Sequence, residues 1–216
     1  SLVAKAKSRE EIESDFGYIA HEISKFVRYE CYKNEELLFN KLAKDGTIFL
    51  AISDEGGYKV PEQYYAPAKK DDFNDKKYNP VQESKKSLHL AIDFPTMNGL
   101  EKEIAKELNN QEKVLWWMRN KVEPGFYNIQ AWRKNKIYPD FVVAKKTDDG
   151  KLELVYILES KGDQLAENLD TKYKTLVFQK MTEASKNGVG VKKFSNYDFK
   201  MVPQSETRSA IRELFK

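Results

Sequence analysis

The sequence predicts an α/β fold in which a mixed β-sheet is flanked by helices, preceded by a mostly helical N-terminal extension. Successive apolar runs with strand character lie between residues 113 and 161, and stretches with apolar residues at helical spacing lie on both sides of them. The sequence TDDG at residues 147–150 separates the last two runs and is typical of a hairpin turn. The resulting order of helix, three strands, helix, strand and helix fits a sheet covered by helices.

The N-terminal extension is predicted to occupy residues 1–87. The capping-box spacing S-x-x-E at residues 8–11 favours a helix from there to about residue 44. Two apolar segments around a glycine turn predict a hairpin within residues 47–60. Residues 61–87 are rich in tyrosine, lysine and proline and have no apolar period, which is typical of a long loop or linker. We therefore place a domain boundary after residue 87 and expect a second domain at residues 88–216.

The second domain is predicted to alternate between helical and strand segments. Strands are indicated by β-branched and aromatic runs, and helices by apolar residues three and four positions apart. In chain order, the segments are a helix at 98–109, a strand or short helix at 113–120, strands at 126–132, 137–146 and 151–161, a helix at 165–185, a strand at 198–202 and a helix at 205–214.

The composition limits the possible sites and locations. The single cysteine, Cys31, excludes an internal disulfide and a cysteine-based zinc cluster, and two histidines, His21 and His89, argue against a histidine-rich metal site. No apolar run reaches the roughly 18 residues of a membrane span, and no secretory signal opens the chain. We expect a cytoplasmic protein without a membrane partner. The chain begins at Ser1, and we expect it to be a piece of something longer.

Positive charge is concentrated in the second half of the chain. Residues 101–216 carry 22 Lys and Arg against 17 Asp and Glu, a balance of +5, whereas residues 1–100 have a balance of −2. This distribution is compatible with a polyanionic partner such as nucleic acid. It is equally compatible with solvated lysines on helix surfaces.

Three charged residues frame the predicted hairpin YPDFVVAKKTDDGKLELVYILESK at residues 138–161. Because side chains two positions apart share a strand face, Glu159 and Lys161 should point one way and Ser160 the other. Asp140 follows Pro139 at the start of the preceding strand, so folding at the turn should bring it level with Glu159. The alternative is that Asp140 only caps a turn and that Glu159 and Lys161 form a solvated ion pair on the strand surface.

Two close carboxylates repel each other unless a cation lies between them. Oxygen ligands, in a chain with few sulfur and imidazole groups, favour Mg²⁺, for which Mn²⁺ substitutes. The predicted ligands are Asp140, Glu159 and the backbone carbonyl of Ser160. Lys161 would orient or deprotonate the attacking water and stabilise charge in the transition state. The reaction class predicted from this set is phosphodiester hydrolysis.

The same residues carry a resemblance to a known group of enzymes. Pro139-Asp140 followed by Glu159-Ser160-Lys161 resembles the motif of the PD-(D/E)xK nuclease superfamily. Together with WWMRN, PGFYNIQAW, YPDFVV and ILESKG, it resembles the endonuclease domain of type III restriction enzymes over roughly residues 90–185. The resemblance implies a restriction-endonuclease-like fold, Mg²⁺ dependence and cleavage of double-stranded DNA. It also implies a larger ATP-using enzyme, with a helicase region in the parent chain and a methyltransferase subunit.

The resemblance further implies a glutamate on the first core helix as an auxiliary metal ligand, and Glu101 is the matching residue. Its spacing with Ile104 and Leu108 predicts that its carboxylate faces inward. The alternative is that Glu101, three residues after Asn98, closes a capping box. Glu103 and Glu107 are predicted to lie on the outer face of this helix.

Basic residues near the motif are candidates for contacts with the DNA backbone, which give affinity without reading the sequence. The candidates are Lys172, Arg133, Lys134 and Lys136. The alternative functions are another nuclease of the same fold, such as a repair enzyme or junction resolvase, and a catalytically silent DNA- or protein-binding module. A structural domain with an incidental ion pair is a third alternative.

Overall fold

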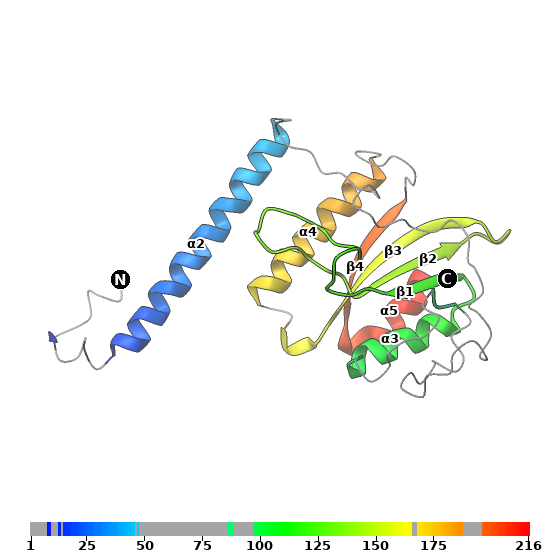
Figure 1. Ribbon diagram of the computed structural model, residues 1–216, viewed down its shortest axis with the longest axis horizontal. Coiled ribbons are helices and arrows are strands. Elements are labelled where there is room, and N and C mark those ends of the chain that lie inside the picture. The colour runs from blue at the N-terminus through cyan, green and yellow to red at the C-terminus, as the bar shows by residue number, and fades with distance from the viewer. Residues whose placement is uncertain are drawn as a thin grey trace. The chain divides into compact units, whose positions relative to one another are not determined.

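A four-stranded mixed β-sheet with helices on both faces forms the main part of this protein, described here from a computed structural model (Figure 1). The structure describes residues 8–9, 13, 15–45, 47, 86–88, 97–165, 168–187 and 196–216. The strands are β1 (Val114–Arg119), β2 (Phe141–Lys146), β3 (Leu152–Lys161) and β4 (Tyr197–Pro203). The α-helices are α2 (Phe16–Lys44), α3 (Gly99–Asn110), α4 (Leu169–Lys186) and α5 (Thr207–Leu214), and short 3-10 turns are η4 (Asp163–Leu165) and η5 (Gln204–Glu206).

The strands lie in the order β1-β2-β3-β4. β1 pairs with β2 and β2 with β3 in antiparallel fashion, whereas β3 and β4 are parallel because α4 forms the crossover between them. The predicted hairpin of β2 and β3 is confirmed: Phe141 pairs with Leu158, and Gly150 adopts the left-handed conformation (φ 82°) in the turn. Glycine suits this position because other residues rarely adopt positive φ.

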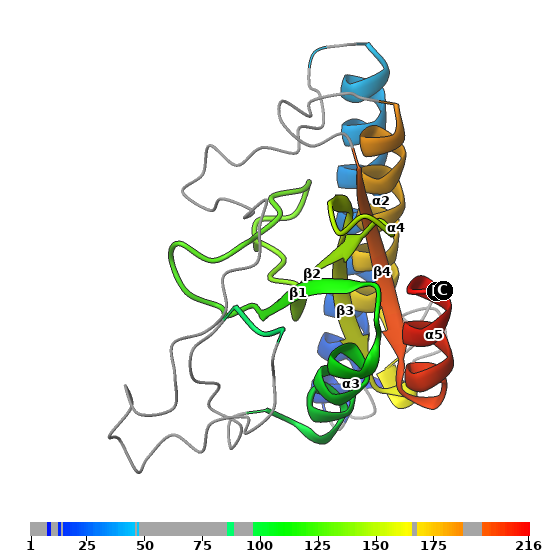
Figure 2. The same cartoon turned by 90° about the vertical axis from the view of Figure 1, so that its right-hand side faces the viewer.

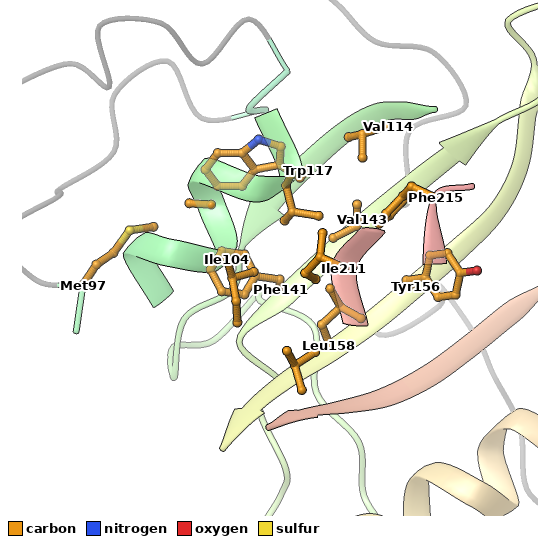
Figure 3. Packing of buried hydrophobic residues seen from close by; sticks show 13 residues of the cluster. Met97, Ile104, Val114, Trp117, Phe141, Val143, Tyr156, Leu158, Ile211 and Phe215 are labelled. Atoms are coloured by element: carbon orange, nitrogen blue, oxygen red, sulfur yellow. The ribbon is translucent and has the colours of Figure 1, made fainter. Parts of the chain in front are cut away.

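The helices cover the two faces of the sheet. Alternate residues of the strands, including Phe141, Val143 and Leu158, pack with Ile104 of α3 and Ile211 of α5 in one buried cluster (Figure 3). Figures 1 and 2 both show α3 and α5 side by side, and α5 also contacts β4. On the opposite face, α4 contacts β4.

The strand residues that alternate with those of the buried cluster point to the other face of the sheet and contact α4. The ring centroids of Phe178 in α4 and Phe199 in β4 lie 5.7 Å apart, a usual separation for packed aromatic side chains. Figure 1 shows α4 on one side of the sheet and the α3–α5 pair on the other. Because strand side chains alternate, every odd-numbered residue of β3 from Val155 to Lys161 belongs to the α4 face.

Two expectations for this part of the chain are wrong. Residues 126–132 do not form a strand: they contribute only a single bridge between Ile129 and Ile137, within an otherwise irregular segment. Glu107 is not on an outer surface, because α5 packs against α3 and covers it. Its carboxylate lies 3.4 Å from Nε of Arg212 and 3.9 Å from Nε of Arg208, so two cations offset its charge, although its Oε2 is buried without a hydrogen-bond partner.

The N-terminal helix is confirmed over residues 16–44 and groups with residues 132–135 in a compact unit separate from the sheet. Within α2, no side chain is buried, and large apolar side chains such as Phe16, Phe26 and Leu37 are exposed. Apart from Thr47, the predicted hairpin at residues 47–60 lies outside the described residues, as does most of the predicted linker. None of the helices in the described residues is both long enough and apolar enough to cross a membrane.

Candidate active site at the end of the sheet

The predicted acidic residues meet at one end of the β2–β3 hairpin. Asp140 directly precedes β2, and because Phe141 pairs with Leu158, it lies level with Glu159 near the end of β3. Both strands are buried through their apolar middle sections, which fix the position of their ends. Lys161 ends β3 two residues after Glu159 and therefore stands on the same face.

Asp140 is held by the neighbouring strand. Its Oδ2 accepts hydrogen bonds from the backbone N–H of Ser160 (2.7 Å) and from the Ser160 hydroxyl (2.5 Å). Burial raises the pKa of Asp140, the two hydrogen bonds from Ser160 oppose that shift, and the charge of Glu101 adds to it. Ser160 alternates with Glu159 and Lys161 along β3, and its hydroxyl nevertheless reaches Asp140. The reason is that Asp140 lies before the first residue of β2, so its side chain is not confined to one sheet face.

Of the two carboxyl groups, Glu159 has the more strongly raised pKa. Its residue is 5% exposed, and burial followed by the negative charge of Asp140 raises its pKa to about 7. Oε1 accepts a hydrogen bond from the ammonium of Lys174 in α4 at 2.5 Å. Oε2 is buried and has no hydrogen-bond partner. A buried carboxylate oxygen without a donor is costly, and among the described residues Oε2 of Glu107 shares this condition.

Glu101 points inward as predicted, and it also forms the predicted alternative, the capping box. Its Oε2 accepts from the backbone N–H of Asn98 (2.9 Å), and its backbone N–H donates to the Asn98 side chain (2.9 Å). The same oxygen lies 3.0 Å from Nη2 of Arg119 in β1. Glu101 is therefore part of an ion pair that borders Asp140, and its role as a metal ligand stays a prediction.

The donor atoms at this sheet end suit a small divalent cation with two protein carboxylates. Magnesium characteristically takes one or two carboxylates and keeps its other positions for water and substrate phosphate. The charge of Asp140 acts on Glu159, whose Oε2 has no hydrogen-bond partner and is the oxygen that could bind such a cation. Among the described residues, no group of three or more His, Cys, Asp and Glu is arranged to hold a metal ion.

Asn120 positions the segment that leads to Asp140, and it was not among the predicted site residues. Its side-chain amide donates to the carbonyl oxygens of Tyr127 (2.7 Å) and Pro139 (2.8 Å) and accepts from the N–H of Tyr127 (3.0 Å). Its backbone N–H donates to the Asp140 carbonyl at 2.7 Å. The buried amide therefore ties both ends of an irregular loop to β1. The motif WWMRN contains this residue, so a sequence signal was present.

The four predicted DNA contacts are divided between the two units of the structure. Arg133 and Lys134 fall in the unit that contains α2, where the Arg133 guanidinium carbon lies 3.8 Å from the centroid of the Tyr32 ring. Lys136 and Lys172 are exposed side chains of the sheet-containing unit. Lys174, two residues further along α4, is the lysine that contacts the acidic pair.

Comparison with known proteins identifies the chain at the level of a family. The family model described as the YagJ family matches residues 82–214. The chain belongs to the YagJ family. No curated protein and no solved structure matches it. The matched range contains the whole sheet, α3, α4 and α5, and it includes every residue of the candidate site. Membership in the YagJ family therefore concerns the sheet-containing unit, and α2 lies outside the match.

Proposed function

We propose that the sheet-containing unit is a metal-dependent DNA endonuclease domain with a restriction-endonuclease-like fold. The observation that carries the proposal is the convergence of Asp140 and Glu159 at one sheet end, where burial raises the pKa of both carboxyl groups. Neighbouring carboxyl groups with raised pKa values at the rim of a buried sheet are typical of sites that bind a cation or transfer a proton. The order α3, β1, β2, β3, α4 and β4 supports the proposed fold, because it places the motif on adjacent antiparallel strands.

In this proposal, Asp140 and Glu159 hold Mg²⁺, for which Mn²⁺ substitutes, together with the backbone carbonyl of Ser160. The cation supplies positive charge at the scissile phosphate and acidifies water. The serine fixes Asp140 in place through two hydrogen bonds. Lys161 stands on the Glu159 side of β3 and orients or deprotonates the attacking water, and it stabilises the negative charge that develops on the phosphate.

The proposed substrate is double-stranded DNA, and the proposed setting is a type III restriction-modification enzyme. In that setting, a helicase region of the parent chain uses ATP, and a methyltransferase subunit is a further partner. Lys136 and Lys172, which are exposed, are the proposed phosphate contacts of the sheet-containing unit. Arg133 and Lys134 are proposed as additional contacts from the other unit.

A second candidate function is a catalytically silent nucleic-acid- or protein-binding module of the same fold. The observation that favours it is the ion pair between Lys174 and Glu159, since a positive charge is already present beside the carboxylate that should bind metal. In such a module, the lysine would be a permanent substitute for the cation. Such a module is expected to bind nucleic acid or protein without cleaving DNA.

Cleavage of supercoiled plasmid in Mg²⁺ tests the proposal. We expect the wild-type chain to convert supercoiled plasmid to nicked and linear forms, and we expect Asp140→Asn, Glu159→Gln and Lys161→Met to abolish conversion while leaving the fold intact. Glu153→Gln is a matched control, because Glu153 is an exposed carboxylate on the same strand. Equal cleavage by all variants would reject the assigned site. DNA binding without cleavage, including in the presence of a helicase region and a methyltransferase subunit, would favour the silent module.

A further inference from the structure

Lys174 is a feature of the site that phosphodiester hydrolysis by itself does not require. It projects from α4, on the face of the sheet opposite α3 and α5, and its ammonium lies 2.5 Å from Oε1 of Glu159. Its side chain is 21% exposed, and that of Glu159 is 7% exposed. The ion pair is therefore largely shielded from water, where the attraction between opposite charges exceeds that of a surface pair.

Lys174 has a second acidic partner on its own helix. Oδ2 of Asp170 lies 3.7 Å from Nζ, at the i,i+4 spacing that brings side chains together on a helix. Asp170 has a side chain that is 58% exposed, so its carboxylate lies toward solvent at the start of α4. The ammonium thus lies within ion-pair distance of a buried carboxylate and of an exposed one.

We propose that Lys174 is a resident counter-cation that a divalent ion displaces from Glu159, and that Asp170 receives the displaced ammonium. This inference rests on the proposed function, because it assumes that Glu159 is a metal ligand. A divalent ion must come within about 2 Å of a carboxylate oxygen of Glu159. An ammonium that remained in contact with the same carboxylate would repel it. A cation at Oε2 and an ammonium at Oε1 of the same carboxylate would repel each other, which favours a different position of Lys174 in the metal-bound site.

The sign of a change in metal affinity tests this inference. We expect Lys174→Met to tighten Mn²⁺ binding by about tenfold at pH 8, because a competing positive charge is removed from Glu159. Asp170→Asn should weaken Mn²⁺ binding several-fold, because the displaced ammonium loses its second partner. Lys172→Met, which removes an exposed charge on the same helix, is the matched control and should change the affinity less than about twofold. Mn²⁺ binding to the full chain is measured from the electron paramagnetic resonance signal of free Mn²⁺, without DNA.

Each result supports or overturns the inference. If Lys174 only orients Glu159, its replacement will weaken Mn²⁺ binding or leave it unchanged, and the inference is wrong while the metal site stands. If Lys172→Met tightens binding as much as Lys174→Met does, the effect is that of net charge, and the inference is again wrong. If neither the wild type nor any variant binds Mn²⁺, the metal site of the proposed function fails together with the inference. Asp170→Asn alters an exposed side chain, so it tests the inference even if Lys174→Met does not fold, and unchanged affinity in that variant would overturn the role of Asp170.

Discussion

Glu159 should make the metal-free protein less stable as the pH rises, and Glu159→Gln should remove that effect. Its pKa is about 7 in the folded chain, against an ordinary value of 4.5. A carboxyl group whose pKa is raised by folding binds a proton more tightly in the native state. Between pH 4.5 and 7, the native state keeps a proton that the unfolded state has lost, so the free energy of unfolding falls as the pH increases through this window.

The expected size follows from the shift. A difference of about 2.5 pH units corresponds to about 3 kcal/mol of unfolding free energy, lost progressively between pH 4.5 and 7. Because the Glu159 side chain is 7% exposed, solvent screening removes little of this value. A glutamine cannot ionise, so the variant should retain only the smaller contribution of Asp140, whose pKa is also raised by burial.

Urea unfolding in EDTA at pH 5, 6, 7 and 8 measures this dependence. We expect the wild type to lose most of the roughly 3 kcal/mol between the first and last of these conditions, and we expect Glu159→Gln to be nearly flat over the same range. Glu153→Gln, on the exposed part of the same strand, should retain the wild-type dependence. The reasoning is refuted if Glu159→Gln shows the same fall in stability as the wild type, or if wild-type stability rises between pH 5 and 7.

Three further predictions concern the surroundings of the acidic pair. Asn120→Ala should lower the free energy of unfolding by about 2 kcal/mol, because it leaves the N–H of Tyr127 and the carbonyl of Pro139 without their buried partner; urea unfolding at constant pH measures this, and an unchanged midpoint would contradict it. Ser160→Ala should raise the pKa of Asp140 further, because one donor to its carboxylate is lost; a carboxyl NMR titration checks the direction, and a lowered pKa would contradict it. Mn²⁺ at pH 8 should raise the melting temperature of the wild type and leave Asp140→Asn unchanged, and equal shifts in both would exclude Asp140 as a ligand.

The parts of the structure that depend on local signals could be predicted from the sequence. The β2–β3 hairpin follows from apolar runs on either side of TDDG, and its pairing brings Asp140 level with Glu159. The capping box at the start of α3 is likewise a local pattern, and it is present. In contrast, strand propensity over residues 126–132 was misleading, because a buried amide from the end of β1 satisfies the backbone there and replaces a ladder of strand hydrogen bonds.

Features that depend on packing between distant segments could not be predicted in this way. Glu107 is buried by a helix that begins about one hundred residues later in the chain, and the periodicity of its own helix contains no information about that contact. Lys172 and Lys174 are similar in the sequence, and only the rotation of α4 over the sheet decides which one reaches Glu159. Asn120 lies in the motif WWMRN, but its hydrogen bonds to two carbonyls depend on the path of the loop.

The stability of the sheet end and its proposed chemistry impose opposite demands on Glu159. Apolar residues would be the most stable choice at the end of two buried strands, yet a carboxylate with one unpartnered oxygen is present. Lys174 relieves this conflict only in part, since it reaches Oε1 and leaves Oε2 without a donor. Oε2 of Glu107 in α3 is also buried without a hydrogen-bond partner, so what distinguishes Glu159 is its place level with Asp140 at the end of the two strands. The unfavourable oxygen is therefore the feature that most directly links the fold to the proposed activity, because a bound cation would satisfy it and at the same time offset the charge that Asp140 and Glu159 share.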